Sequence, residues 1–159
     1  MEPTSAAKAG QPWPFKMVAP VEPGIVCINL DRMLKFYTEV LGLKVFSDAQ
    51  TTPEMSTKFG STPHGYRIVR LQTPDGGRIK LVQPNQDAPA QNPVPHWVFE
   101  RQGIAYFTFI VDDAKPILAR LKANHVTLIS EEPVEVRKGV FAQFLLDPEG
   151  NYVEFVELN

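Results

Sequence analysis

The chain has 159 residues and a formal net charge of −2, with 43% hydrophobic and 21% charged residues. This length suits one domain with a sizeable core, and this composition excludes wholesale disorder. The sequence has neither a basic stripe, which nucleic acid or an anionic membrane would require, nor an apolar run of roughly 18 residues, which a membrane span would require. We therefore expect neither a nucleic-acid nor a membrane partner.

The beginning of the chain predicts an irregular arm and an intracellular protein. Residues 1–20 contain four prolines, and the first ten lack the apolar stretch of a signal peptide. Cys27 is the only cysteine, so an internal disulfide is impossible. We expect a cytoplasmic protein with its working domain in residues 21–158.

The first half of the domain predicts a strand, a helix and three further strands. A strand at 24–28 is followed by Asn29, a good helix N-cap, and by apolar residues at helical spacing as far as Leu41. Gly42 fits the left-handed position that ends a helix. A short strand is predicted at 43–46, a loop with room for one helical turn at 49–64, and strands at 66–71 and 78–82 that are joined by a turn at 73–77.

A proline-rich linker at 85–102 separates this half from a second one with the same order of elements. A strand at 104–111 leads to a helix, for which we expect Asp112 or Asp113 to be the cap. His125 falls at a position where a left-handed residue should end that helix. A short strand-like segment at 126–129 and strands at 140–146 and 152–158 complete the half, with a turn at 147–151.

The two halves are copies of one unit. Residues 74–82 (PDGGRIKLV) match residues 148–156 (PEGNYVEFV), and Asn29 falls on Asp113. The same register places Glu22 on Tyr106 and Lys80 on Glu154. We therefore predict an α+β fold of two paired β-α-β-β-β units, at 21–84 and 103–158, that form a cleft between curved mixed sheets.

Those four residues are the first candidates for a site. A strand sends alternate side chains to opposite faces, so one face packs on the helix and the other meets something else. Polar or ionisable residues at equivalent points of both units indicate a shared, inward-facing polar site. The alternative is that Lys80 and Glu154 are ordinary charges on a solvated sheet face.

Two motifs carry a resemblance to a known family. Residues 29–37 (NLDRMLKFY) with 41–43 (LGL), and residues 147–154 (DPEGNYVE), resemble motifs of the vicinal oxygen chelate superfamily. That superfamily includes glyoxalase I, methylmalonyl-CoA epimerase, extradiol dioxygenases, and fosfomycin and bleomycin resistance proteins. The resemblance covers about residues 21–158 and implies a glyoxalase-like fold, a small-molecule substrate or ligand, and a homodimer.

The resemblance also implies a divalent metal, whose ligands in the family are commonly His or Gln, Glu, His and Glu. Carried over one by one, these positions are Glu22, Lys80, Tyr106 and Glu154. Lys80 departs from the pattern, because an ammonium group has no lone pair and repels a dication. Tyr106 also departs, because it stands where the family commonly has a histidine ligand. We expect no cofactor; the alternative is a divalent metal held by Glu22 and Glu154.

Without a metal, the same residues predict acid-base chemistry. Glu154 or Glu22 would take a proton next to a carbonyl, Lys80 would stabilise the enolate oxygen, and Tyr106 would donate a hydrogen bond to it. A salt bridge that fills an old metal site in a binding protein is the alternative. Three other residues are predicted to bind the substrate: Arg70, Phe144 and Tyr66. The resemblance implies that Arg70 and Phe144, which are equivalent in the repeat, point into the cleft.

Three functions are compatible with these residues and motifs. The leading one is a lyase or isomerase of the glyoxalase/epimerase type. The second is a non-catalytic protein that binds a drug-like or aromatic molecule, as bleomycin resistance proteins do. The third is a metal-dependent lyase or dioxygenase with unusual ligands.

Overall fold

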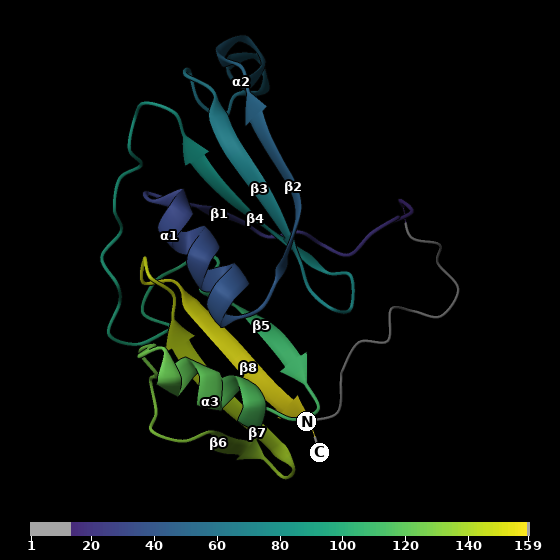
Figure 1. Cartoon of the computed structure of the whole chain (residues 1–159), viewed down its shortest axis with the longest axis vertical. Coiled ribbons are helices and arrows are strands. Elements are labelled where there is room, and N and C mark those ends of the chain that lie inside the picture. Colours follow the sequence, from purple (N-terminus) through teal and green to yellow (C-terminus); the bar gives the residue numbers. More distant parts are fainter. Residues whose placement is uncertain (1–13, 159) are drawn as a thin grey trace.

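The structure, a computed structural model, describes residues 14–158 and contains two four-stranded mixed sheets (Figure 1). The first unit holds β1 (Gly24–Val26), β2 (Lys44–Thr51), β3 (Tyr66–Gln72) and β4 (Arg78–Pro84), in the sheet order β1-β4-β3-β2. Its helices are α1 (Leu30–Lys35), which continues as the π-helix η1 (Phe36–Val40), and α2 (Pro53–Phe59).

The second unit repeats this arrangement. It holds β5 (Tyr106–Val111), β6 (Val134–Arg137), β7 (Val140–Leu146) and β8 (Tyr152–Leu158), in the order β5-β8-β7-β6, together with α3 (Lys115–Ala123). In Figure 1, α1 and α3 cover their sheets on the same side of the molecule. The predicted α+β architecture of two β-α-β-β-β units is therefore confirmed.

The strand registers agree with the register of the sequence repeat. Gly24 of β1 lies opposite Lys80 of β4, and Thr108 of β5 lies opposite Glu154 of β8, both in parallel pairs. Across the antiparallel pairs, Arg70 lies opposite Lys80, and Phe144 lies opposite Glu154. Lys80 and Arg70 thus occupy the same places in unit one as Glu154 and Phe144 occupy in unit two.

One hydrophobic core runs through both units. The helix-facing residues of β3 and β4 include Leu71 and Leu81, which are fully buried, and those of unit two include the fully buried Val153. The ring of Tyr37 on η1 stacks at 6.3 Å from the ring of Phe107 on β5, so unit one packs directly on the edge strand of unit two. Alternation along the strands leaves the other face of each sheet open.

The predicted helix boundaries are mostly confirmed. Asn29 Oδ1 accepts a hydrogen bond of 2.9 Å from the backbone N–H of Arg32, and Gly42 and His125 adopt the left-handed conformation with φ values of 81° and 55°. The cap of α3 differs, because Ala114 occupies the N-cap position and Asp113 only accepts from the N–H of Lys115. No helix among residues 14–158 has the length and apolar character needed to cross a membrane.

Two expectations about the edges of the sheets were wrong in extent. β2 continues to Thr51, beyond the predicted 43–46, and α2 makes two turns where a loop with one helical turn was expected. Residues 127–129 are strand-like as expected, but they join the sheet only through the bridge of Leu128 to Leu145 and two backbone hydrogen bonds. The outer strand of unit two is instead β6, all of whose residues are exposed. Edge strands with little burial carry no alternation of apolar and polar residues, so periodicity does not reveal them.

Candidate functional site

Three cationic side chains surround Glu22 on the open face of the first sheet. Arg78 Nη1 lies 3.2 Å from Glu22 Oε1, while Arg70 Nε and Lys80 Nζ lie 3.7 and 3.9 Å from Oε2. Their placement follows from the sheet, because Arg70 and Lys80 are cross-strand neighbours and Arg78 points to the same face two residues earlier. We call these four residues the Glu22 cluster.

The Glu22 cluster is partly enclosed and carries more positive than negative charge. Its four side chains are between 20% and 35% exposed. The guanidinium of Arg78 lies 3.6 Å from the centre of the Phe46 ring, and its Nε is buried without a hydrogen-bond partner among the described residues. The Nε–H group of Arg78 is therefore a hydrogen-bond donor without an acceptor among the described residues.

The open face of the second sheet combines a carboxylate with aromatic rings. Thr108 Oγ1 donates a hydrogen bond of 2.5 Å to Glu154 Oε2. The rings of Tyr106 and Phe144 meet edge to face at 5.0 Å, and Phe99 from the linker lies 6.0 Å from Tyr106. Glu154 therefore lies beside an aromatic surface, with a neutral hydroxyl as its hydrogen-bond donor.

The structure brings the predicted site residues together in two sets. Glu22, Lys80 and Arg70 lie in the Glu22 cluster, and Tyr106, Phe144 and Glu154 lie on the open face of unit two. No ion pair or hydrogen bond within residues 14–158 joins Lys80 to Glu154. That all four repeat-matched residues meet in one cleft stays a prediction.

Tyr66 lies apart from both sets. It opens β3 opposite Pro84, four residues from Arg70, and is half-buried. Within the described part of the chain, no hydrogen bond or ring contact connects it to the Glu22 cluster. Its predicted role in binding a substrate is therefore untested.

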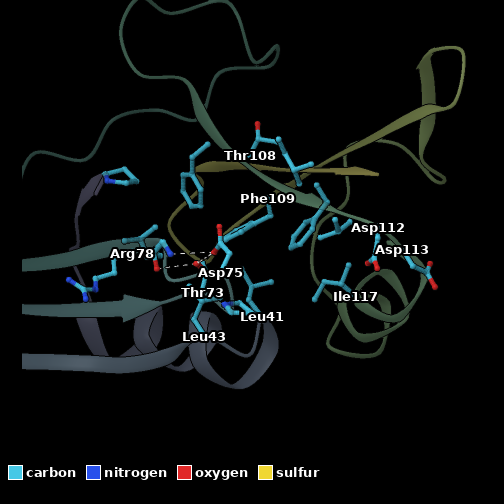
Figure 2. A pocket seen from close by; sticks show the side chains of 18 of the residues that line it. Leu41, Leu43, Thr73, Asp75, Arg78, Thr108, Phe109, Asp112, Asp113 and Ile117 are labelled. Atoms are coloured by element: carbon cyan, nitrogen blue, oxygen red, sulfur yellow. Dashed lines mark hydrogen bonds between the residues drawn. The ribbon is translucent and has the colours of Figure 1, made fainter. Parts of the chain in front are cut away.

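A cavity of about 790 Å³ lies between the two units (Figure 2). Figure 2 shows Thr73, Asp75 and Arg78 of unit one on one side, and Phe109 and Ile117 of unit two on the other. Arg78 of the Glu22 cluster and Thr108, the hydrogen-bond partner of Glu154, both line it, but none of the site residues predicted from the sequence does. Most of the remaining lining is apolar, from Leu41, Leu43, Ile79, Phe107, Ile110 and Phe155.

Sequence reasoning predicted a cleft between the units but missed Arg78 and the residues that line the cavity, for different reasons. Arg78 and Lys80 are two residues apart on one strand, and this spacing alone places them on the same face, so the signal was available. The cavity has no such signal, because its walls come from the turn at 73–77, β5 and the start of α3. Only the packing of one unit on the other creates it.

The turn at 147–151 (DPEGN) fixes that packing. Both oxygens of Glu149 accept hydrogen bonds from the start of α1, at 2.9 Å from Ile28 N and 2.6 Å from Asn29 N. The Tyr37 hydroxyl donates to Asp147 Oδ2 at 2.9 Å. Burial raises the pKa of Asp147 above its usual value, although hydrogen bonds from Asn151 and Tyr37 oppose that rise. Burial likewise raises the pKa of Tyr37.

The positions at which the resemblance implies a divalent metal do not fit one. Lys80 places an ammonium group there, and Arg70 and Arg78 place two more cations against the oxygens of Glu22 that would have to coordinate the metal. Within residues 14–158 there is no group of three or more His, Cys, Asp or Glu side chains that could hold a metal ion. We derive no chemistry through a metal at this site.

The fold is shared with several solved structures. A glyoxalase family protein from Bacillus cereus is 22% identical, with a TM-score of 0.74 over 92% of this chain and 98% of its own. The trypanothione-dependent glyoxalase I of Leishmania major is 26% identical, with a TM-score of 0.60 over 86% of this chain and 84% of its own. Glyoxalase I of Zea mays is 19% identical, with a TM-score of 0.65 over 87% of this chain and 44% of its own.

The family comparison gives the same result. No curated protein matches the sequence. The family model described as the Glyoxalase/Bleomycin resistance protein/Dioxygenase superfamily matches residues 18–155, which include both units and the linker. The chain therefore belongs to the glyoxalase/bleomycin resistance protein/dioxygenase superfamily.

Proposed function

We propose that this chain is a lyase or isomerase of the glyoxalase/epimerase type that transfers a proton next to a carbonyl without a transition metal. The observation that carries the proposal is the environment of Glu154. It is a half-buried carboxylate whose hydrogen-bond donor is the neutral Thr108 hydroxyl, whereas the cations of the open faces gather around Glu22.

Glu154 is the general base in this proposal. Its Oε2 accepts the Thr108 hydrogen bond, and its Oε1 takes the proton from the carbon beside the substrate carbonyl. The negative charge moves to the carbonyl oxygen, where Lys80 stabilises it. Tyr106 donates a further hydrogen bond. Glu154 then gives the proton to the neighbouring carbon of an enediolate, which gives isomerisation of a hydroxycarbonyl compound, or to a leaving group that departs from the neighbouring carbon with its electron pair, which gives a lyase.

We infer in addition that the protein works as a homodimer in the cytoplasm. The two sets of site residues lie on the open faces of different sheets, and no hydrogen bond or ion pair within the described chain joins Lys80 to Glu154. A second copy could place one chain's Glu22 cluster against the other chain's Glu154. Sedimentation of the purified protein at the mass of a monomer would contradict the dimer.

The acid-base step is tested by isotope exchange. A suitable probe is 2-oxo-4-phenylbutanoate, which has exchangeable hydrogens beside a ketone. We expect wild-type protein in D2O to accelerate exchange at that carbon, as followed by proton NMR, and Glu154→Gln to slow it by about 100- to 10,000-fold. The control is Glu131→Gln, an exposed carboxylate in a loop, which should exchange at the wild-type rate.

Lys80→Met separates stabilisation of the transition state from simple binding. The change keeps most of the apolar stem and removes the charge, so it should lower the exchange rate more than it weakens binding. Equal exchange in wild type and Glu154→Gln would remove Glu154 as the base. The only remaining carboxylate at the repeat-matched positions would then be Glu22.

A binding protein without turnover is the second candidate, and the cavity between the units favours it. Its volume of about 790 Å³ lies within the range of small-molecule sites, and its lining is mainly aromatic and aliphatic. Tight binding of an aromatic molecule with no exchange or conversion would support this function over the first.

A further inference from the structure

The charges of the Glu22 cluster are not balanced within the cluster itself. Three cations share one carboxylate, which leaves two positive charges uncompensated by Glu22. Exposure between 20% and 35% means that water screens these charges only in part. A partly buried excess of like charges is costly, and a bound anion would relieve that cost.

The donors of the cluster are suited to an oxyanion. Arg70 and Arg78 each carry a planar fork that can hold a carboxylate or phosphate through two hydrogen bonds, and Lys80 adds a point charge between them. Arg78 Nε is itself buried, so an anion would contact the outer nitrogens of the Arg78 guanidinium. The Phe46 ring against its guanidinium holds that group in place.

Apolar space adjoins these donors. Arg78 also lines the cavity between the units, where Leu43, Ile79 and Phe109 present apolar surface and Asp75, Asp112 and Asp113 present carboxylates. These carboxylates disfavour an anionic group inside the cavity, so an anion held at the Glu22 cluster would extend only its apolar body into it (Figure 2).

We propose that the Glu22 cluster and the cavity together bind an organic anion. Its carboxylate or phosphate contacts Arg78, Arg70 and Lys80, and its apolar body occupies the space between the units. The inference deepens the small-molecule site of the proposed function and rests on that site, but it does not depend on the proton transfer.

The test is isothermal titration calorimetry with four probes: octanoate, octyl phosphate, 1-octanol and acetate. We expect both eight-carbon anions to bind at least 10-fold more tightly than 1-octanol, because the alcohol has no charge. Octanoate should also bind far more tightly than acetate, with about a fourfold gain for each methylene that becomes buried. The tighter of the two anions identifies the preferred head group.

Variants locate the site. Arg78→Met removes the guanidinium and should weaken octanoate about 10- to 100-fold, as expected for a lost charge-assisted hydrogen bond. Lys80→Met should weaken it as well, and thermal unfolding confirms that each variant is folded. The matched control is Arg67→Met, which removes an arginine from the opposite face of the same strand as Arg70, where it pairs with Asp48 and Asp31, and should bind octanoate as wild type does.

Equal affinity for octanoate and 1-octanol, or unchanged octanoate binding in folded Arg78→Met and Lys80→Met, would overturn the inference. The outcome is independent of the catalytic proposal. Octanoate binding without deuterium exchange would support the anion site and refute the proton transfer. Exchange without selective anion binding would support the proton transfer and refute the anion site.

Discussion

Glu149 should be one of the strongest determinants of stability, although it lies in a turn. Its side chain is only 7% exposed, accepts from Ile28 N and Asn29 N, and has Arg32 Nη2 at 3.4 Å from Oε1. These contacts connect unit two to the first turn of α1, where backbone N–H groups lack partners within the helix. We predict that Glu149→Ala destabilises the whole domain.

The magnitude follows from the two backbone hydrogen bonds. Each hydrogen bond to a charged group contributes about 1.5–3 kcal/mol. Ile28 is 38% exposed and Asn29 is also exposed, so water can reach the freed N–H groups. We therefore take the lower value for both bonds, which gives about 3 kcal/mol. For a chain of this size, this corresponds to a fall of roughly 6–12 °C in Tm.

The assay is urea unfolding followed by circular dichroism, with wild type, Glu149→Ala and Glu149→Gln. The glutamine keeps one acceptor oxygen but loses the charge, so its free energy of unfolding should lie between the other two. Glu131→Ala, which removes an exposed carboxylate, is the control and should match wild type. A loss below about 0.5 kcal/mol in Glu149→Ala, the level of ordinary surface substitutions, would refute the reasoning.

Four further predictions concern titration and metal content. Because burial raises the pKa of Cys27 to about 12, a thiol reagent at pH 8 should label the protein only after unfolding. The raised pKa of Asp147 means that its contribution to stability is fully present below the usual carboxyl pKa and falls as pH rises through the folded value. Tyr37→Phe should raise that pKa further in a carbon NMR titration. Elemental analysis should find well under one equivalent of Zn, Ni, Fe or Mn; a stoichiometric metal lost in Glu154→Ala would contradict our assignment.

The parts of the fold that could be predicted are those specified by neighbouring residues. The two Pro-acidic-Gly turns and the helix ends at Asn29, Gly42 and His125 are local signals, and the structure confirms them. Matching one unit to the other then places Lys80 and Glu154 at equivalent positions without any knowledge of the fold, and the strand registers agree. Local chemistry and the internal repeat are sufficient for this.

The parts that could not be predicted depend on distant residues. β2 extends through Asp48, Ala49 and Gln50 because it pairs with β3. The sequence does not predict this extension, because those three residues are exposed and show no alternation of apolar and polar side chains. Glu149 looks like an ordinary turn residue until its partners, 120 positions away, are known. The charge of the Glu22 cluster likewise depends on which strands are neighbours.

The contact between Glu149 and α1 makes the two units unequal during synthesis. The start of α3 is satisfied within its own unit, because Glu157 accepts from Ala114 N and Asp113 accepts from Lys115 N. The start of α1 is satisfied only in part within its own unit: Asn29 Oδ1 accepts from Arg32 N and Gln83 Oε1 accepts from Leu30 N, but the carboxylate that accepts from Asn29 N lies 120 residues further along the chain. At translation rates of about 5–20 residues per second, that partner emerges roughly 6–24 s later. Unit one therefore leaves the ribosome before the carboxylate that accepts from Ile28 N and Asn29 N has been made.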